Sequence, residues 1–115
     1  MDAVLQRLIE LDEIQNALIV GKDGLIVSGM LHNEDEEMMG AMSAAAFGSV
    51  ANYTNQISSG EARHVMVEAK TGTIHMEGAG DLILIVSTRG VNNPGRIRLE
   101  MKKACQQLVQ LVGNY

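Results

Sequence analysis

Aromatic residues are scarce in this sequence, so its core must be built largely without them. Among the 115 residues there is no tryptophan, and the aromatic side chains are Phe47, Tyr53 and Tyr115. Eight methionines and many alanines stand in their place. Aliphatic and thioether side chains pack adaptably but define the shape of a core less sharply. A chain of this length can bury one such core, so we expect a single domain over residues 1–115.

Cysteine and uninterrupted apolar runs are also lacking. Cys105 is the single cysteine, so no intrachain disulfide can form, which suits a reducing compartment. The first seven residues lack the basic start and apolar run of a secretory signal. The longest uncharged stretch, residues 38–60, holds too many polar residues and glycines to cross a bilayer. We therefore expect a cytoplasmic protein without membrane insertion.

Positive charge is neither abundant nor concentrated. Nine basic residues face fourteen acidic ones, for a net charge of −5, and the longest basic run is the pair Lys102-Lys103. Nucleic-acid binding requires a concentrated basic face that releases counterions from phosphates. The sequence therefore argues against a nucleic-acid partner.

Catalytic and metal-binding patterns are missing too. The histidines are His32, His64 and His75, and none takes part in an H-x-x-x-H spacing, nor is there a C-x-x-C pair. His64 and His75 fall on neighbouring predicted strands but out of register, so we expect them not to face each other directly. Cys105 lies on the apolar face of a predicted helix, which favours a buried, inert thiol.

The glycine-containing segments 21–24 and 78–81 precede strands, whereas a phosphate cradle leads into a helix. We therefore predict no cofactor, no metal and no enzymatic activity.

The residues present predict eight elements in the order α-β-β-α-β-β-β-α. Asp2 is placed to cap a first helix, and apolar runs on either side of segment 21–24 predict a β-hairpin. Asn33, with Glu36 three residues later, predicts the start of a long helix that ends near Ser58. The later elements are three strands over residues 62–68, 73–77 and 82–86, and a final helix opened by residues 92–95. A five-stranded antiparallel sheet between the long helix and the two terminal helices follows, so the fold class is mixed α/β (α+β).

The long helix carries no charge between Glu37 and Glu61. Helical spacing predicts that one arc packs on the sheet: Met39, Met42, Ala46, Val50, Tyr53 and Ile57. The opposite side is small and uncharged: Gly40, Ala41, Ala44, Ala45, Gly48, Ala51, Asn52 and Asn55. Each interior glycine costs about 1 kcal/mol relative to alanine, so we expect this side to meet the same helix of a second copy. The alternative is that both sides are covered within one chain.

Four segments together resemble the Roadblock/LC7 family, at family spacing and over nearly the whole chain. They are residues 17–27 in the hairpin, the alanine-rich helix from Glu37, residues 80–86 in the last strand, and residues 93–99 at the start of the final helix. The resemblance implies a profilin- or longin-like sandwich. It also implies a homodimer in which strand 63–68 pairs with its copy and the long helices lie side by side.

The resemblance further implies which residues form contacts. The dimer interface would comprise Gly40, Ala41, Ala44, Ala45, Gly48, Ala51, Arg63, Val65 and Val67. A Ras-like small GTPase would dock on the long-helix side, at Met38, Ala41, Ala45, Asn52 and Asn55. For Arg63 we expect ion pairing at the interface rather than catalysis as an arginine finger.

The sequence therefore predicts a non-catalytic homodimer that regulates or scaffolds a Ras-like small GTPase by modulating its nucleotide cycle or localisation. Two alternatives stay open. One is a structural dimerisation subunit of a larger motility or transport complex. The other is a small-molecule-sensing domain, which requires a pocket with converging polar groups.

Overall fold

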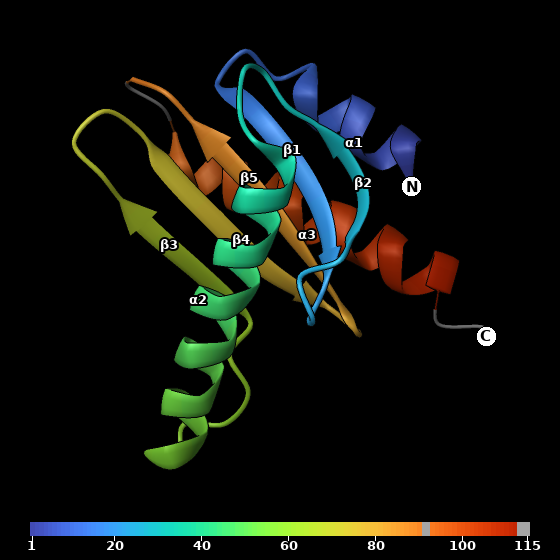
Figure 1. Ribbon diagram of the computed structural model, residues 1–115. Coiled ribbons are helices and arrows are strands. Elements are labelled where there is room, and N and C mark those ends of the chain that lie inside the picture. The colour runs from blue at the N-terminus through green and yellow to red at the C-terminus, as the bar shows by residue number, and fades with distance from the viewer. Residues whose placement is uncertain (91–92, 113–115) are drawn as a thin grey trace.

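A computed structural model describes residues 1–90 and 93–112, and these form one sheet with helices on both faces (Figure 1). The elements are α1 (Asp2–Ile9), β1 (Ile14–Gly21), β2 (Ile26–Met30), α2 (Glu36–Gln56), β3 (His64–Glu68), β4 (Thr73–Ala79), β5 (Leu82–Thr88) and α3 (Pro94–Val112). Their order confirms the predicted α-β-β-α-β-β-β-α arrangement.

The five strands lie in the order β2-β1-β5-β4-β3, and all neighbours are antiparallel. β5 is central because its sequence is apolar at every position from Leu82 to Val86. Leu84 and Val86 contribute to the core under α1 and α3, and Ile83 and Ile85 to the core under α2. The sheet is therefore buried on both faces at its centre.

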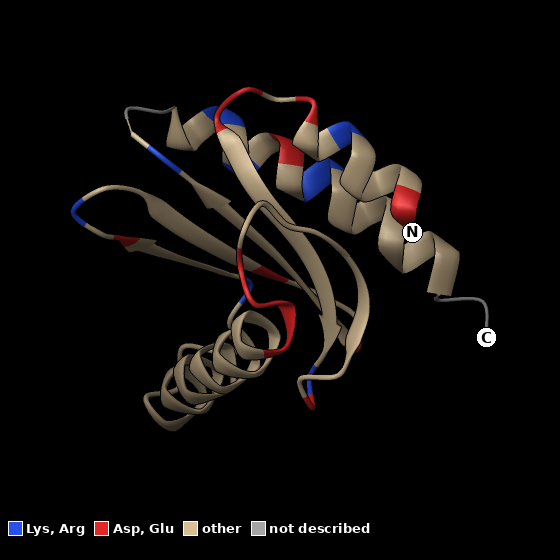
Figure 2. Ribbon diagram, turned by 45° about the horizontal axis from the view of Figure 1, so that its top comes forward, with Lys and Arg blue, Asp and Glu red and all other residues tan. Residues whose placement is uncertain are grey.

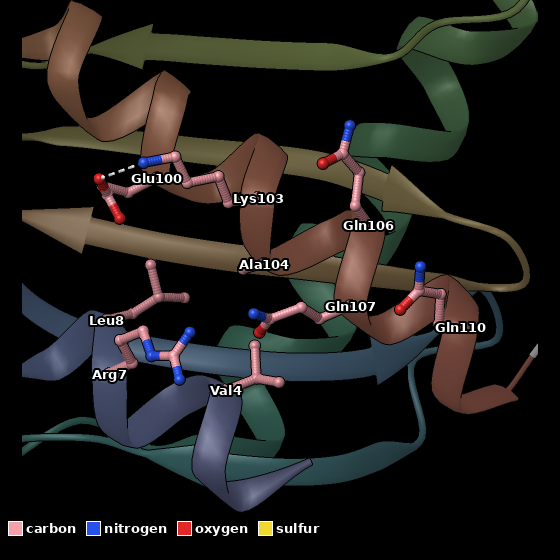
Figure 3. Close-up of a pocket in the computed structure, with 9 residues that line it drawn as sticks. All are labelled: Val4, Arg7, Leu8, Glu100, Lys103, Ala104, Gln106, Gln107 and Gln110. Atoms are coloured by element: carbon pink, nitrogen blue, oxygen red, sulfur yellow. Dashed lines mark hydrogen bonds and ion pairs between the residues drawn. The ribbon is translucent and has the colours of Figure 1, made fainter.

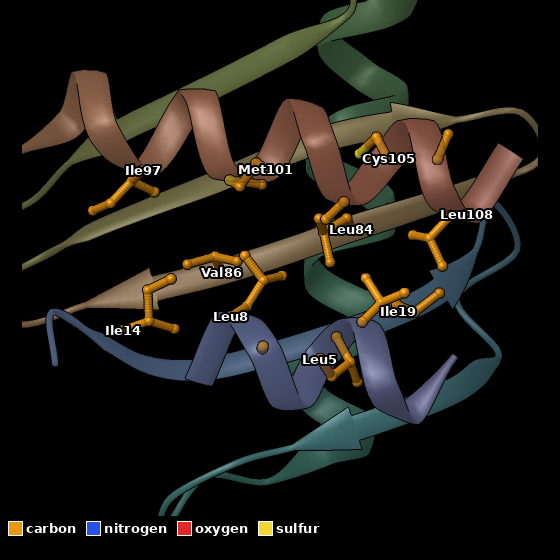
Figure 4. Packing of buried hydrophobic residues seen from close by; sticks show 14 residues of the cluster. Leu5, Leu8, Ile14, Ile19, Leu84, Val86, Ile97, Met101, Cys105 and Leu108 are labelled. Carbon is orange, nitrogen blue, oxygen red and sulfur yellow. The ribbon is translucent and has the colours of Figure 1, made fainter. Parts of the chain in front are cut away.

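The larger core lies between the sheet and the pair α1 and α3 (Figure 4). Leu5 of α1, Leu108 of α3 and Ile19 of β1 are fully buried there. Asp2 does not cap α1 as predicted, because Met1 holds the N-cap position and Asp2 is the first helical residue. Its carboxylate instead accepts a hydrogen bond from the Ser28 hydroxyl, which ties α1 to β2.

The predicted hairpin is confirmed between β1 and β2. Gly24 has a φ of +89°, a left-handed conformation that glycine adopts at little cost. The Asp23 carboxylate accepts a hydrogen bond from the Leu25 amide at 3.0 Å, and the Gly21 amide donates to the Leu25 carbonyl at 2.9 Å. The turn is thus held by both backbone and side chain.

The long helix begins two residues later than predicted from Asn33. Asp35 is its N-cap, and the Asp35 carboxylate accepts a hydrogen bond from the Met38 amide at 3.1 Å. Asn33 instead has a φ of +61°, a turn conformation that asparagine tolerates. The helix ends at Gln56, and Ser58 follows at a φ of +61°.

The final helix begins at Pro94, as predicted. The Asn93 side chain accepts a hydrogen bond from the Arg96 amide at 3.2 Å, and proline suits the first turn because its missing amide would be unpaired there anyway. Asn92, which was predicted to share in this cap, lies outside the described residues. Within those residues, no helix is both long and apolar enough to cross a membrane.

Candidate protein-interaction site

Small residues seat α2 on the sheet. Gly40 and Ala44 are buried against it, and a Cβ at Gly40 would lie 3.1 Å from Val20 Cγ1. One turn further, the ring of Phe47 occupies the space over Gly78, where a Cβ would lie 3.3 Å from its Cζ. The glycines therefore permit close approach of the helix to its own sheet.

This seating corrects the predicted orientation of the helix by roughly a quarter turn. Met42, Tyr53 and Ile57 were expected to pack on the sheet, yet they are 66%, 64% and 55% exposed. Gly40 and Ala44 were expected on the opposite side, yet they are buried. The helical wheel failed because it left Phe47 outside the sheet-facing arc, whereas the sheet accommodates Phe47 together with the small residues Gly40 and Ala44.

The exposed side of α2 is consequently wider and more apolar than predicted. We call it the outer face of α2, and it comprises Met38, Ala41, Met42, Ala45, Ala46, Gly48, Ser49, Asn52, Tyr53, Asn55, Gln56 and Ile57. None of these residues is charged, and Figure 2 shows acidic colour only where the helix begins. Exposed helix surfaces normally carry many charges, so this face is suited to contact with another protein.

The second half of α2 makes little contact with its own chain. Its fully buried residues end at Phe47, and Val50, Ala51 and Thr54 are only partly buried. In Figure 1 this half projects beyond the ends of the strands. A Cβ at Gly48 would meet no atom within 4 Å, so this glycine is not explained by packing within the chain.

The residues predicted for contacts fall into three groups. All five predicted for partner binding are exposed: Met38, Ala41, Ala45, Asn52 and Asn55. Of the predicted dimer residues, Ala41, Ala45, Gly48, Arg63 and Val67 are exposed, and Ala51 and Val65 are partly buried. Gly40 and Ala44 are buried against the sheet of their own chain, so they offer no exposed surface to a second copy. The interface itself stays a prediction.

β3 forms one edge of the sheet and continues the apolar surface. Val65 and Val67 lie on the α2 side of the strand and His64 and Met66 on the other side, as the alternation predicted. Met66 and Val67 are 43% and 44% exposed, which is unusual for apolar residues of a strand. An unprotected apolar edge strand tends to pair with another strand.

A polar cluster under α3 was not predicted. His64 Nδ1 lies 2.8 Å from Glu77 Oε1, and His64 Nε2 lies 3.1 Å from His75 Nδ1. The two histidines are out of register and not directly opposed, as predicted, yet their rings are in contact. The register does pair His64 with Glu77 and His75 with Met66, but diagonal neighbours on one face of a sheet remain within reach of long side chains.

Burial shifts the pKa values of His75 and Cys105 in favour of their neutral forms. Burial lowers the pKa of His75 to about 4, and the charges of His64 and Arg98 act in the same direction. Burial also raises the pKa of the Cys105 thiol well above its usual value, and the nearby Glu77 adds to this effect. Cys105 is buried, as predicted, and has none of the electropositive exposure of a reactive thiol. Within the described part of the chain, no group of histidine, cysteine or acidic residues could hold a metal ion.

The groove between α1 and α3 has a volume of about 410 Å³ (Figure 3). Its lining includes Gln106, Gln107 and Gln110, and an ion pair joins Lys103 Nζ to Glu100 Oε1 at 3.4 Å. The groove lies on the helical surface rather than between sheet and helix. Six of its nine lining residues are polar, and Val4, Leu8 and Ala104 supply the apolar part, whereas an ordinary small-molecule site is predominantly apolar.

The layered architecture and strand order define a profilin-like α/β domain. The structure is similar to Schizosaccharomyces pombe profilin, with a TM-score of 0.72 and 15% identity over 96% of this chain and 97% of that one. A family model for the Roadblock/LC7 domain matches residues 1–88. The chain belongs to the Roadblock/LC7 family.

Two further comparisons agree with this assignment. A protein of Methanocaldococcus jannaschii, MJ1340, is 37% identical over 109 residues, which span 94% of this chain and 96% of that protein. Myxococcus xanthus MglB is structurally similar, with a TM-score of 0.91 and 22% identity over 98% of this chain and 94% of that one. The predicted fold and family are therefore confirmed.

Proposed function

We propose that the chain is a non-catalytic homodimer that binds a Ras-like small GTPase and regulates or scaffolds it. The observation that carries this proposal is the outer face of α2. It runs from Met38 to Ile57 without a charged residue, and it includes side chains as large as Met42 and Tyr53. Leaving this much apolar surface in water is unfavourable, by roughly 25 cal/mol per Å², so a partner that covers it gains free energy.

The adjoining edge of β3 supports the homodimer. Val65 and Val67 lie on the same side of the sheet as α2, so strand pairing at β3 would bring the outer faces of two α2 helices together. An isologous contact of this kind closes after two copies. Gly48, which has open space around it, would allow the two helix backbones to approach closely.

The family and its structural neighbours support the choice of partner. Membership of the Roadblock/LC7 family and the structural similarity to MglB fit a small-GTPase-regulating role. We infer that the same class of partner docks on the outer face of α2 here, at Met38, Ala41, Ala45, Asn52 and Asn55.

The test is a titration of the purified chain with Ras-like small GTPases of its source organism, loaded with GDP or with a non-hydrolysable GTP analogue. Calorimetry measures binding, and a phosphate-release assay measures any change in hydrolysis. Met42→Glu and Tyr53→Glu place a charge on the outer face without disturbing the core, because both side chains are exposed. Each variant should weaken GTPase binding at least tenfold.

Val109→Glu is the matched control, since Val109 is 45% exposed on α3, on the other side of the sheet. This variant should bind the GTPase as the unmodified chain does. Sedimentation run in parallel shows whether a variant still forms the dimer. A variant that stays dimeric but binds the GTPase more weakly has a defect in GTPase binding alone. A stable dimer that binds no GTPase in either nucleotide state would refute the proposal and favour a structural subunit instead.

A further inference from the structure

The backbone of β3 is oriented for pairing with a further strand. The Arg63 carbonyl accepts from the Gly78 amide at 3.1 Å, and the Ala69 amide donates to the Gly72 carbonyl at 2.8 Å. These odd-numbered positions therefore direct their polar groups towards β4. Because hydrogen-bonding direction alternates along a strand, His64, Met66 and Glu68 direct theirs towards the open edge.

A basic pocket lies beside this edge, between β3 and α3. Arg63, Arg98 and Lys102 line it together with His64, and its volume is about 460 Å³. The three cationic side chains are exposed, and none takes part in an ion pair among the described residues. The one acidic residue of the lining, Glu77, is already paired with His64. In a chain of net charge −5, this pocket lacks a matching carboxylate.

The symmetry of a β3–β3 pair restricts where the second copy can lie. When a two-fold axis relates two antiparallel copies of one strand, the axis must pass through a residue that lies opposite its own copy. The axis cannot fall between two residues, because directly opposed side chains share one face of the sheet whereas consecutive side chains lie on opposite faces. The possible centres in the middle of the strand are Val65, Met66 and Val67. A centre at Met66 alone pairs all five residues of His64–Glu68.

Charge distinguishes the same registers. With Met66 at the centre, Glu68 of the second copy lies opposite His64, at the rim of the basic pocket. A centre at Val67 would place a second copy's Lys70 there, which the three cations would repel. A centre at Val65 would place Met66 of the second copy opposite His64 and its Glu68 opposite Ala62, outside the strand.

We propose that in the homodimer β3 pairs with its copy about Met66, and that Glu68 of each protomer enters the basic pocket formed by Arg63, Arg98 and Lys102 of the other. This inference rests on the homodimer of the proposed function, and it specifies the register and the residue that the second copy contributes. The two apolar pairs between Val65 and Val67 lie on the opposite face, under the α2 helices. Each pocket is completed by a carboxylate that its own chain does not supply.

Cysteine scanning of β3 tests the register. Directly opposed residues in an antiparallel pair have Cα atoms roughly 4.5 to 5.5 Å apart, which a disulfide can span. Met66→Cys should therefore cross-link two copies under mild oxidation faster than Val65→Cys or Val67→Cys. Buried Cys105 can be retained, and mass spectrometry of the linked peptide identifies the bond. A faster cross-link from Val65→Cys or Val67→Cys would overturn the proposed register.

Charge exchange tests the pocket. Glu68→Gln should raise the dimer dissociation constant about tenfold, a change of about 1.4 kcal/mol, and high salt should reduce the difference. Glu68→Arg should weaken the dimer further, and Arg98→Glu in the same chain should restore much of the loss. Glu34→Gln is the control, because Glu34 is exposed in the loop before α2, away from β3.

The outcomes separate this inference from the proposed function. A dimer that is insensitive to Glu68→Gln refutes the pocket contact but leaves the dimer and its GTPase partner standing. A dimer with the Met66 register that binds no GTPase keeps this inference and refutes the proposed partner. A chain that stays monomeric at micromolar concentration refutes both.

Discussion

His64 and His75 share a contact of 3.1 Å between Nε2 and Nδ1, on the side of the sheet that α3 covers. One of these nitrogens must carry a proton and the other must accept it, so the contact is made only while at least one ring is neutral. His75 is the fully buried member, and its Nε2 has no hydrogen-bond partner in the described structure. A positive charge on His75 would therefore be poorly accommodated.

This environment predicts that the protein loses stability in mild acid. The pKa of His75 is about 4 in the folded chain and 6.5 as a free side chain, so between these values the unfolded chain binds the proton and the folded chain does not. The free energy of unfolding should fall by up to about 1.4 kcal/mol per pH unit as the pH decreases through this window. Above pH 6.5 this contribution should be constant. Urea unfolding at a series of pH values measures the slope.

His75→Gln should flatten that slope, because the group that titrates in the unfolded chain is gone. His32→Gln serves as the matched control, since it removes an exposed histidine from the loop before α2. An identical pH dependence in the chain with and without His75 would contradict the explanation.

Cys105 should be unreactive in the folded protein. Its thiol is buried, and burial together with the nearby Glu77 keeps the pKa above its usual value, so little thiolate is available at pH 8. A chromogenic disulfide reagent should label it only as fast as the chain unfolds, and fully in denaturant. Rapid labelling of the native chain, at the rate of a small free thiol, would show that the site is open.

Asp35 should contribute more to stability than its acidic neighbours. Asp35→Ala removes the carboxylate that accepts from the Met38 amide, and the loss of such a cap costs about 1 kcal/mol. Glu34→Ala alters an exposed residue of the same charge and should change the free energy of unfolding by less than about 0.5 kcal/mol. Denaturant titration compares the two, and equal effects would mean that charge near the helix end matters more than capping.

The two helical glycines should respond differently to alanine. Both substitutions gain about 1 kcal/mol of helix propensity. At Gly48 the added methyl group meets open space, whereas at Gly40 it lies 3.1 Å from the side chain of the buried Val20. Gly48→Ala should therefore raise the free energy of unfolding more than Gly40→Ala does, measured at a concentration where the chain is monomeric. A larger gain from Gly40→Ala would contradict the described seating of α2.

The order and type of the elements followed from local sequence patterns. The apolar run at Leu82–Val86 marked the central strand, and the glycines at 21 and 24 marked the hairpin, because each depends on neighbouring residues alone. The Roadblock/LC7 resemblance was likewise visible in short segments at a fixed spacing. The order of the elements and the family resemblance can therefore be predicted without knowing which residues meet in the folded chain.

The orientation of α2 and the histidine cluster depended on contacts distant in sequence. A helical-wheel projection of α2 could not show that the Phe47 ring would pack over Gly78, because Gly78 lies on a strand about thirty residues later in the sequence. The one available signal was Phe47 itself, the sole phenylalanine, which marks the sheet-facing side better than the methionines do. The diagonal contact of His64 with His75 required the strand register, which the Lys70–Gly72 turn alone did not specify.

The projecting half of α2 has a consequence for how association can be observed. Its last turns, around Tyr53, contain no fully buried residue, so in the isolated protomer their amide hydrogens should exchange with solvent quickly. Any protein that covers this stretch would slow that exchange. Hydrogen–deuterium exchange at this helix end therefore shows, without a label, whether a partner is bound.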